Sequence, residues 1–523
     1  MTFFDDIPQR GTTTFPNGRP NMQPRVTSLL ASLLPLALAA VSFAQANPPA
    51  SAAQLKTPPK TWVDKDTGHR VTRLTDELGS KGLYFDENAY TPDGLDMVYT
   101  SPKGIHDLNL ATLKSNLLVS GRVGAVIVGT KTRRVFYENR TDGRYYVIDI
   151  DTRKVTKLPI VNLAGHVYIS TVNADETLLA GTFIEGKAPE FNKYRLDAIS
   201  SVKPAFDQIG QTSAEINTTT TVAGRSLGET IEALNQARAG STTALGVAKS
   251  KLNEAQSQQA VADALTADTN AKMADAQAQL KQANANAVQK RFDAREPEDL
   301  FTLNLQTGEV KIILKGTDWL NHVKFSPTDP TLLLYDHEGP ALQVDRVWTI
   351  RADGAHNVLM QNRSDPAGIA THEFWSHDGK TVWFDLQESK GQDFAVAGVD
   401  VATGNRTTYR LKKEEASIHY NLSPDGKVFC GDGNLMTHGE IGVNGHRTLD
   451  RAWIELLRPS PDGTFHSTRL AHLADNNYEL TEPNPRFSPD KKMVIFTSNM
   501  LGHNYIFAVD VAKAPPTTTV AAQ

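Results

Sequence analysis

A short turn phrase that recurs along the chain constrains the fold more than any other feature of the sequence. In its full form the phrase reads Ser/Thr-Pro-Asp-Gly. Copies or close variants start at Thr91, Asn173, Ser326, Ser376, Ser423 and Ser488. Proline fixes φ for a turn, while aspartate and glycine favour the tight bend. An apolar run typical of a β-strand follows each copy, so the phrases predict antiparallel hairpins.

The spacing of the copies predicts how the hairpins are assembled. Strand–turn units recur about every 40–50 residues, which is the period of a propeller blade. We therefore expect an all-β fold, a seven-bladed β-propeller. The blades are expected near residues 84–115, 124–158, 166–314, 320–360, 370–412, 418–470 and 484–511. The segment Trp62–Thr75 is expected to complete the last blade and to close the ring.

The third predicted blade is interrupted by a long insertion. Residues 207–289 are rich in Ala, Gln, Asn, Thr, Lys and Glu and almost without aromatic residues. Leu227–Leu234, Ala244–Leu252 and Ala260–Val288 have the composition of helices. We expect a helical hairpin or loose coiled coil that projects from the ring. Two interpretations stay open: a solvated insertion that the fold tolerates, or a lid or docking element for a partner.

The N-terminal region has the pattern of an export signal. Arg25 precedes an apolar run, Val26–Phe43, and Ala44-Gln45-Ala46 supplies a small-residue cleavage pattern. Residues 1–46 are therefore interpreted as a signal peptide, with Met22 as an alternative start to Met1. A linker at 47–60, a propeller domain at 61–512 and a disordered tail at 513–523 would follow. This organisation predicts a periplasmic or secreted protein whose mature form has no membrane span.

The composition of the chain excludes several classes of binding partner and site. A formal net charge of −5 over 523 residues gives no field that would attract nucleic acid or an anionic membrane. An acidic ligand would need local arginine, lysine or metal. Cys430 is the single cysteine, which excludes a disulfide framework and a cysteine zinc site.

Four histidines lie near strand starts in three successive predicted blades. They are His322, His337, His372 and His419. Each lies at or near the predicted start of a strand. If these strands are the innermost ones, their side chains converge on one central pocket, as expected of a binding or catalytic site.

Several long phrases resemble the oligogalacturonate lyase family. They are Thr67–Leu74, Trp319–Trp348 with its His337-Glu-Gly-Pro340 motif, Thr371–Trp375 and Asn421–Gly433. The resemblance covers roughly residues 60–205 and 290–512, without the insertion. It implies a seven-bladed propeller that splits short uronate oligosaccharides by β-elimination.

The resemblance also implies roles for individual residues. His322 occupies the position of the family's catalytic base, and Arg295 lies near that of a catalytic arginine, with Arg291 as an alternative. A neutral imidazole can remove the proton at C5 when the charge that develops on the uronate carboxylate is neutralised. His337, Arg346 and His419 are candidates for substrate binding, with Arg346 as a carboxylate clamp.

A metal site is the point at which the sequence departs from the family. The family binds manganese through three histidines and a glutamine, of which His372 keeps one. The remaining stretch here contains Glu479, Glu482 and Asn484. The last two have the i, i+2 spacing that places both on one face of a strand. Such a set could hold Mn²⁺, Ca²⁺ or Mg²⁺, or no metal.

Two hypotheses from different classes follow. The first is a lyase that acts on acidic oligosaccharides with a histidine base. The alternative is a non-catalytic periplasmic propeller that binds or scaffolds other molecules, since one fold can carry many functions. The altered metal stretch and the long insertion motivate the second.

Overall fold

The computed structural model describes residues 59–515, apart from gaps at 161–164, 186–190, 239–240, 363–367, 390, 434–452, 474–475 and 477–480. The proposed signal peptide, most of the linker, the end of the tail and Glu479 lie outside the described residues.

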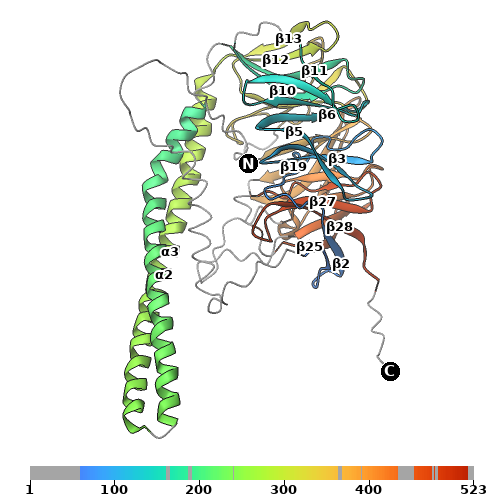
Figure 1. The fold of residues 1–523 in the computed structure, drawn as a ribbon. Coiled ribbons are helices and arrows are strands. Elements are labelled where there is room, and N and C mark those ends of the chain that lie inside the picture. Colours follow the sequence, from blue (N-terminus) through green and yellow to red (C-terminus); the bar gives the residue numbers. More distant parts are fainter. Residues whose placement is uncertain are drawn as a thin grey trace, which may run out of the picture.

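The described strands form seven sheets, and these are the seven blades of a β-propeller (Figure 1). The first blade contains β3 (Asp96–Ser101), β4 (Gly104–Asn109) and β5 (Ser115–Ser120). The second contains β6 (Val123–Val128), β7 (Arg134–Asn139), β8 (Arg144–Asp149) and β9 (Val155–Lys157). The third contains β10 (Gly165–Val172), β11 (Leu178–Glu185), β12 (Glu298–Asn304) and β13 (Val310–Gly316). The fourth contains β14 (Leu320–Phe325), β15 (Leu332–His337), β16 (Val347–Arg351) and β17 (Val358–Leu359). The fifth contains β18 (Ile369–Trp375), β19 (Thr381–Ser389), β20 (Gln392–Asp400) and β21 (Arg406–Arg410). The sixth contains β22 (Tyr420–Leu422), β23 (Phe429–Gly431), β24 (Trp453–Pro459) and β25 (Phe465–His472), preceded by a 3₁₀ turn at Lys413–Glu415.

The seventh blade joins the two ends of the described chain. Its strands are β26 (Arg486–Phe487), β27 (Met493–Ser498) and β28 (Tyr505–Lys513), and β28 pairs in turn with β2 (His69–Arg73) and β1 (Thr61–Val63). Val71 lies opposite Val509 in this antiparallel register. The expected closure of the ring by the segment Trp62–Thr75 is what the structure shows.

The recurring phrase forms the predicted turn, and its serine ties the turn to the next strand. The Ser423 hydroxyl donates to Asp425 at 2.7 Å and accepts from the Val428 amide at 3.0 Å. Gly426 has a φ of 70°, a conformation that side chains with a Cβ rarely adopt. Ser376 and Ser488 make the same pair of bonds in their own blades.

The core lies between neighbouring blades. One buried cluster contains Met97 from the first blade, Val135 from the second and Ile495 from the seventh, so it joins three sheets. Five further clusters pack the rest of the described ring in the same way. Each blade is thus apolar on both faces and holds its neighbours by hydrophobic burial.

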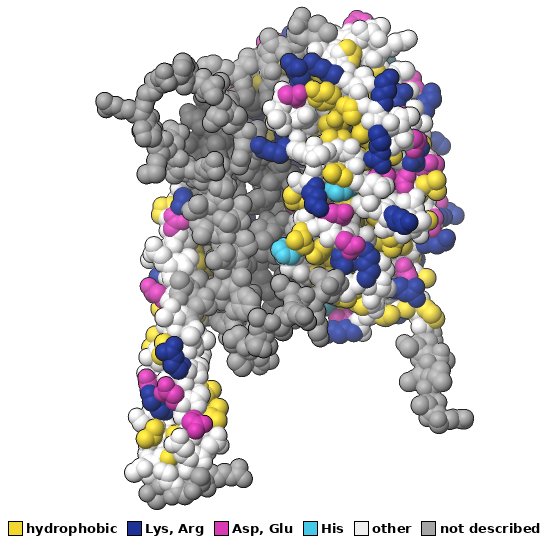
Figure 2. All heavy atoms as spheres, viewed as in Figure 1, with side chains coloured by type: hydrophobic (Ala, Val, Ile, Leu, Met, Phe, Trp, Pro, Cys, Tyr) yellow, Lys and Arg dark blue, Asp and Glu magenta, His cyan; other side chains and the backbone are white. Residues whose placement is uncertain are grey.

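The insertion is a helical hairpin that leaves the third blade between β11 and β12. Helices α2 (Phe191–Arg238) and α3 (Thr242–Ala294) run side by side and project away from the sheets (Figure 1). Both extend beyond the expected bounds of 207–289, and α2 continues through Pro204. Small residues fill the seam, with Ala223 and Ala233 of α2 and Ala248 and Ala255 of α3 buried. Figure 2 shows apolar, acidic and basic side chains mixed along the visible face of the hairpin.

The foot of the hairpin is fastened to the third and fourth blades. Arg291 of α3 pairs with Glu298 of β12 at 2.8 Å, and the same carboxylate accepts from the Leu320 amide at 3.2 Å. Phe292 packs on Gly339, where an added Cβ would lie 2.7 Å from its ring. The end of α3 is therefore anchored beside the strand that carries His322. No helix among the described residues is long and apolar enough to cross a membrane.

Candidate active site

The first strands of several neighbouring blades contact one another, β10 with both β6 and β14, and β22 with β26, so these strands line the axis of the ring. Two of these strands carry a histidine at a β-bulge. The register of β14 shifts between Asn321 and Lys324, and that of β18 shifts between Thr371 and Phe374. His322 and His372 occupy these bulges with φ values of 48° and 51°. Bulges re-aim side chains, so both imidazoles leave the regular alternation of the strand.

Two axial histidines are held by aspartates at the second strand of their own blade, one within β19 and the other directly after β23. His372 Nδ1 lies 2.8 Å from Asp385 Oδ1, and His419 Nδ1 lies 2.6 Å from Asp432 Oδ2. Burial lowers the pKa of His372 well below its usual value and raises the pKa of Asp385 to about 7. Each Nε2 is therefore directed away from its aspartate, as in histidines that bind metals.

The histidines converge on one aromatic residue. Tyr84 lies edge-on to His322, with ring centroids 5.8 Å apart, and edge-on to His419 at 5.4 Å. Its hydroxyl lies 3.3 Å from His419 Nε2. The rings of His372 and His419 are 5.1 Å apart. Histidines from the fourth, fifth and sixth blades thus cluster with Tyr84, which lies in the segment before β3.

The segment that carries Tyr84 is fixed from the seventh blade. The buried guanidinium of Arg486 donates to the carbonyl oxygens of Leu83, Tyr84 and Glu87. Asn484 accepts from the Phe85 amide at 3.3 Å. These hydrogen bonds fix the backbone around Tyr84. Its side chain takes no part in them and lies at the axis.

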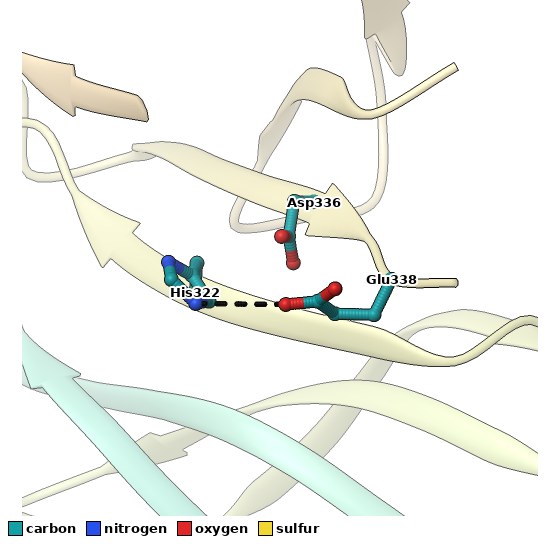
Figure 3. A group of neighbouring side chains, drawn as sticks. All are labelled: His322, Asp336 and Glu338. Atoms are coloured by element: carbon teal, nitrogen blue, oxygen red, sulfur yellow. Dashed lines mark ion pairs between the residues drawn. The ribbon is translucent and has the colours of Figure 1, made fainter. Parts of the chain in front are cut away.

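His322 lies between two carboxylates. Its Nε2 is 3.7 Å from Glu338 Oε1, and its Nδ1 is 3.5 Å from Glu373 Oε1. Figure 3 shows Glu338 directed at the imidazole, with Asp336 above the pair. Arg346 holds the acidic groups together, at 2.7 Å from Glu338, 3.4 Å from Glu373 and 2.5 Å from Asp336. Burial would raise the pKa of Glu338, but Arg346 lowers it to about 2.

A buried lysine adds positive charge at the same place. Lys324 follows His322 on β14, and its ammonium lies 3.3 Å from Glu87 and 3.5 Å from Asp86. Burial opposes the charge, but these two carboxylates raise the pKa of Lys324 above its ordinary value. The lysine is therefore protonated and neutralises the acidic segment beside Tyr84.

The structure brings together only some of the residues expected at the site. His322, His372 and His419 meet at the axis, and Glu482 lies 3.8 Å from His419. His337 does not join them, because it ends the second strand of its blade rather than starting the first. Its ring stacks on Trp348 at 5.1 Å.

The two arginines at the foot of the hairpin are also apart from the histidine cluster. Arg295 is half-exposed at the end of α3, and its described contacts are with Asp318 and Phe292. Arg291 is buried against Glu298 and over the ring of Trp319. Both contacts fasten the helix, and neither places a guanidinium beside His322.

Arg346 is near His322, but the expectation that it clamps a substrate carboxylate does not fit its surroundings. Asp336, Glu338 and Glu373 of the protein already surround its guanidinium. A substrate carboxylate would have to displace one of these buried partners. Arg346 therefore neutralises the carboxylates that flank His322.

Two groups of side chains have donors that suit a divalent cation. His322, Asp336 and Glu338 form a compact group whose ligand atoms all lie within 4.8 Å of one another. A cation there must compete with Arg346 for both carboxylates. His372 and Glu482 are the second group, and both lie beside His419. The Asn484 amide oxygen is bound to the Phe85 amide, so its fit is weaker.

Sequence reasoning missed Tyr84, Lys324 and the aspartates behind the histidines. A sequence pattern could have identified the aspartates. Each turn phrase of the fourth, fifth and sixth blades is followed by an apolar run that ends in aspartate, at Asp336, Asp385 and Asp432. These positions lie beside the axial histidines, because the second strand pairs with the first. Tyr84 follows no turn phrase, so no such sequence pattern marks it.

Replacing Arg346 tests the buried charge network. Arg346→Met leaves three buried carboxylates without their cation, so the free energy of unfolding should fall by about 3–5 kcal/mol. Arg351→Met removes a partly exposed pair with Asp329 and should change stability by only about 0–1 kcal/mol. Denaturant unfolding of both variants gives the comparison, and equal losses would show that the network adds no net stability.

Comparison with known proteins supports the family resemblance over the second part of the chain. The family model described as oligogalacturonate lyase matches residues 287–515. The oligogalacturonate lyase of Dickeya dadantii is 28% identical over 222 residues, which are 41% of this chain and 55% of that protein. The oligogalacturonide lyase of Pectobacterium atrosepticum is 27% identical over 221 residues, again 41% and 55%. The chain thus spans about half the length of the curated relatives it matches.

Solved structures extend the likeness to the whole ring. An oligogalacturonate lyase in complex with manganese aligns with a TM-score of 0.60 and 20% identity, over 87% of this chain and 96% of that one. The oligogalacturonate lyase of Vibrio parahaemolyticus gives the same values. At this identity the alignment establishes the propeller fold. The match over 287–515 contains His322, His372 and His419, and it confirms that this chain resembles the oligogalacturonate lyase family.

Proposed function

We propose that this protein is a lyase that cleaves short uronate oligosaccharides, such as those released from pectin, by β-elimination. The observation that carries the proposal is the position of His322. It lies on a bulge at the propeller axis, between two carboxylates and against Tyr84, inside the part of the chain that matches the family model.

The surroundings of His322 suit a general base. The imidazole would take the proton at C5, which lies next to the uronate carboxylate. Glu338 and Glu373 stand beside the ring nitrogens and would stabilise the imidazolium that forms. Arg346 fixes both carboxylates, so they need no rearrangement during the reaction. The electrons of the C5–H bond form the C4–C5 double bond, and the leaving sugar departs from C4.

A divalent cation, with Mn²⁺ as the first candidate, would be held by His372 and Glu482, with Asn484 as a weaker ligand. Asp385 orients His372 and keeps its Nε2 available. When bound there, the cation supplies positive charge for the uronate carboxylate. Lys324, on the same strand as His322, is a cation of the protein itself, but Asp86 and Glu87 already offset its charge.

The central test is a replacement of the base. His322→Ala should reduce turnover of uronate oligosaccharides by at least about 10²-fold, since it removes the proton acceptor. Absorbance of the 4,5-unsaturated product follows the reaction, with and without added Mn²⁺ or Ca²⁺. His466→Ala, at an exposed position of β25, is the matched control. Binding of these sugars without any product from the wild-type protein would favour a non-catalytic propeller instead.

Metal binding can be tested apart from activity. Asp385→Asn removes the carboxylate that orients His372, so affinity for Mn²⁺ should fall about 10–100-fold in calorimetric titration. Asp263→Asn, on the exposed surface of the hairpin, should leave the affinity unchanged. An unaltered affinity in Asp385→Asn would remove His372 from the ligand set.

We place this activity outside the cytoplasm, in the periplasm or beyond the cell. The support is the sequence pattern of residues 25–46, which ends in Ala44-Gln45-Ala46. N-terminal sequencing of the protein recovered from its cells should begin near Asn47. A first residue upstream of Val26 would contradict a cleaved signal.

A further inference from the structure

Elimination needs a second proton transfer that His322 does not by itself explain. The base takes a proton from C5, while the sugar that leaves C4 departs as a poor anion unless its oxygen receives a proton. The two carbons are neighbours, so a proton donor must stand close to the base and reach the adjacent atom. This inference rests on the proposed lyase function.

Most charged groups around His322 are unsuited to that task. Glu338 is ionised, because Arg346 lowers its pKa to about 2. Glu373 is fully buried and lies against the same guanidinium. Lys324 is paired with Asp86 and Glu87. These three groups set the charge of the site, but none of them offers a neutral hydroxyl that could protonate the leaving oxygen.

Tyr84 is placed differently. It carries a neutral hydroxyl, its ring lies edge-on to that of His322, and its backbone is held by Arg486. Unlike the buried Phe85 that follows it, Tyr84 is partly exposed at the axis. Its hydroxyl also has a fixed neighbour, since His419 Nε2 lies 3.3 Å away and Asp432 holds the other nitrogen of that ring.

We propose that Tyr84 is the proton donor to the leaving oxygen. His322 takes the C5 proton, and the C5–H electron pair becomes the C4–C5 double bond. The C4–O bond breaks with its electrons going to the oxygen, which receives the Tyr84 proton and leaves as a hydroxyl group. The phenolate keeps His419 as its hydrogen-bond partner and regains a proton from solvent, while the His322 imidazolium gives its proton up to solvent. The products are one unsaturated uronate and one sugar alcohol, so no other reactant is required.

Tyr84→Phe tests the assignment, because it removes the hydroxyl and keeps the ring against His322. With a uronate disaccharide, kcat should fall about 10²-fold or more while KM changes little, since the proton moves only in the transition state. With a synthetic uronide that carries 4-nitrophenolate at C4, which leaves as a stable anion, kcat should stay within a few-fold of wild type. Tyr90→Phe is the control, since its hydroxyl bonds to the Phe487 carbonyl in the same segment.

The outcomes separate this inference from the function on which it rests. Equal losses on both substrates would make Tyr84 a structural residue, and no loss on either would assign the proton to water; both results overturn the proposal. In either case His322→Ala should still be inactive, and the lyase function stands. A wild-type protein that cleaves neither substrate would overturn the function and the proton donor together.

Discussion

The site depends on the β-bulges in the innermost strands. In a regular strand, side chains alternate between the two faces of a blade, and both faces are buried against neighbouring blades. The bulges at His322 and His372 break this alternation and turn polar side chains toward the axis. The left-handed backbone at such residues costs about 1–3 kcal/mol each. Packing on both faces of the blades offsets that strain, so the apolar core is what keeps the histidines in place.

The same bulges distribute charge between blades. His372 and Glu373 are consecutive, yet the first turns to Asp385 in its own blade and the second to His322 and Arg346 in the fourth blade. Each histidine then has its own acidic neighbour, while Arg346 and Lys324 offset the excess negative charge. This arrangement reduces the net negative charge of a site that is rich in carboxylates.

Much of the fold could be predicted because blades repeat locally. The expected fourth blade at 320–360 corresponds to strands that run from Leu320 to Leu359, since the turn chemistry fixes where each strand begins. The hairpin was placed in the correct blade, but its ends were misjudged. Its composition changes only near residue 207, whereas the helices run from Phe191 to Ala294, and near the end of α3 Arg291 and Phe292 contact the third and fourth blades.

The site was less predictable because its contacts join distant blades. His322, His372 and His419 could be grouped from their place relative to the turn phrases. His337 could not be separated from them, since a pattern of apolar residues does not tell the first strand of a blade from the second. Arg346 was a candidate for a carboxylate clamp, but its guanidinium is already bound by carboxylates from two blades of the protein itself. Tyr84 lies before the first phrase, where no repeat marks it.

The pairing of β2 with β28 has a consequence for how the protein is made. The ribosome releases Val71 more than four hundred residues before its partner Val509. The edge of β2 that faces β28 must therefore wait for its partner strand until the intervening blades have been synthesised, and long-range pairing of this kind is slow. Closure of the ring brings Asn484 and Arg486 against the segment that carries Tyr84. A chain that stops before Asn484 would thus have its histidines but would lack the two residues that hold the backbone around Tyr84.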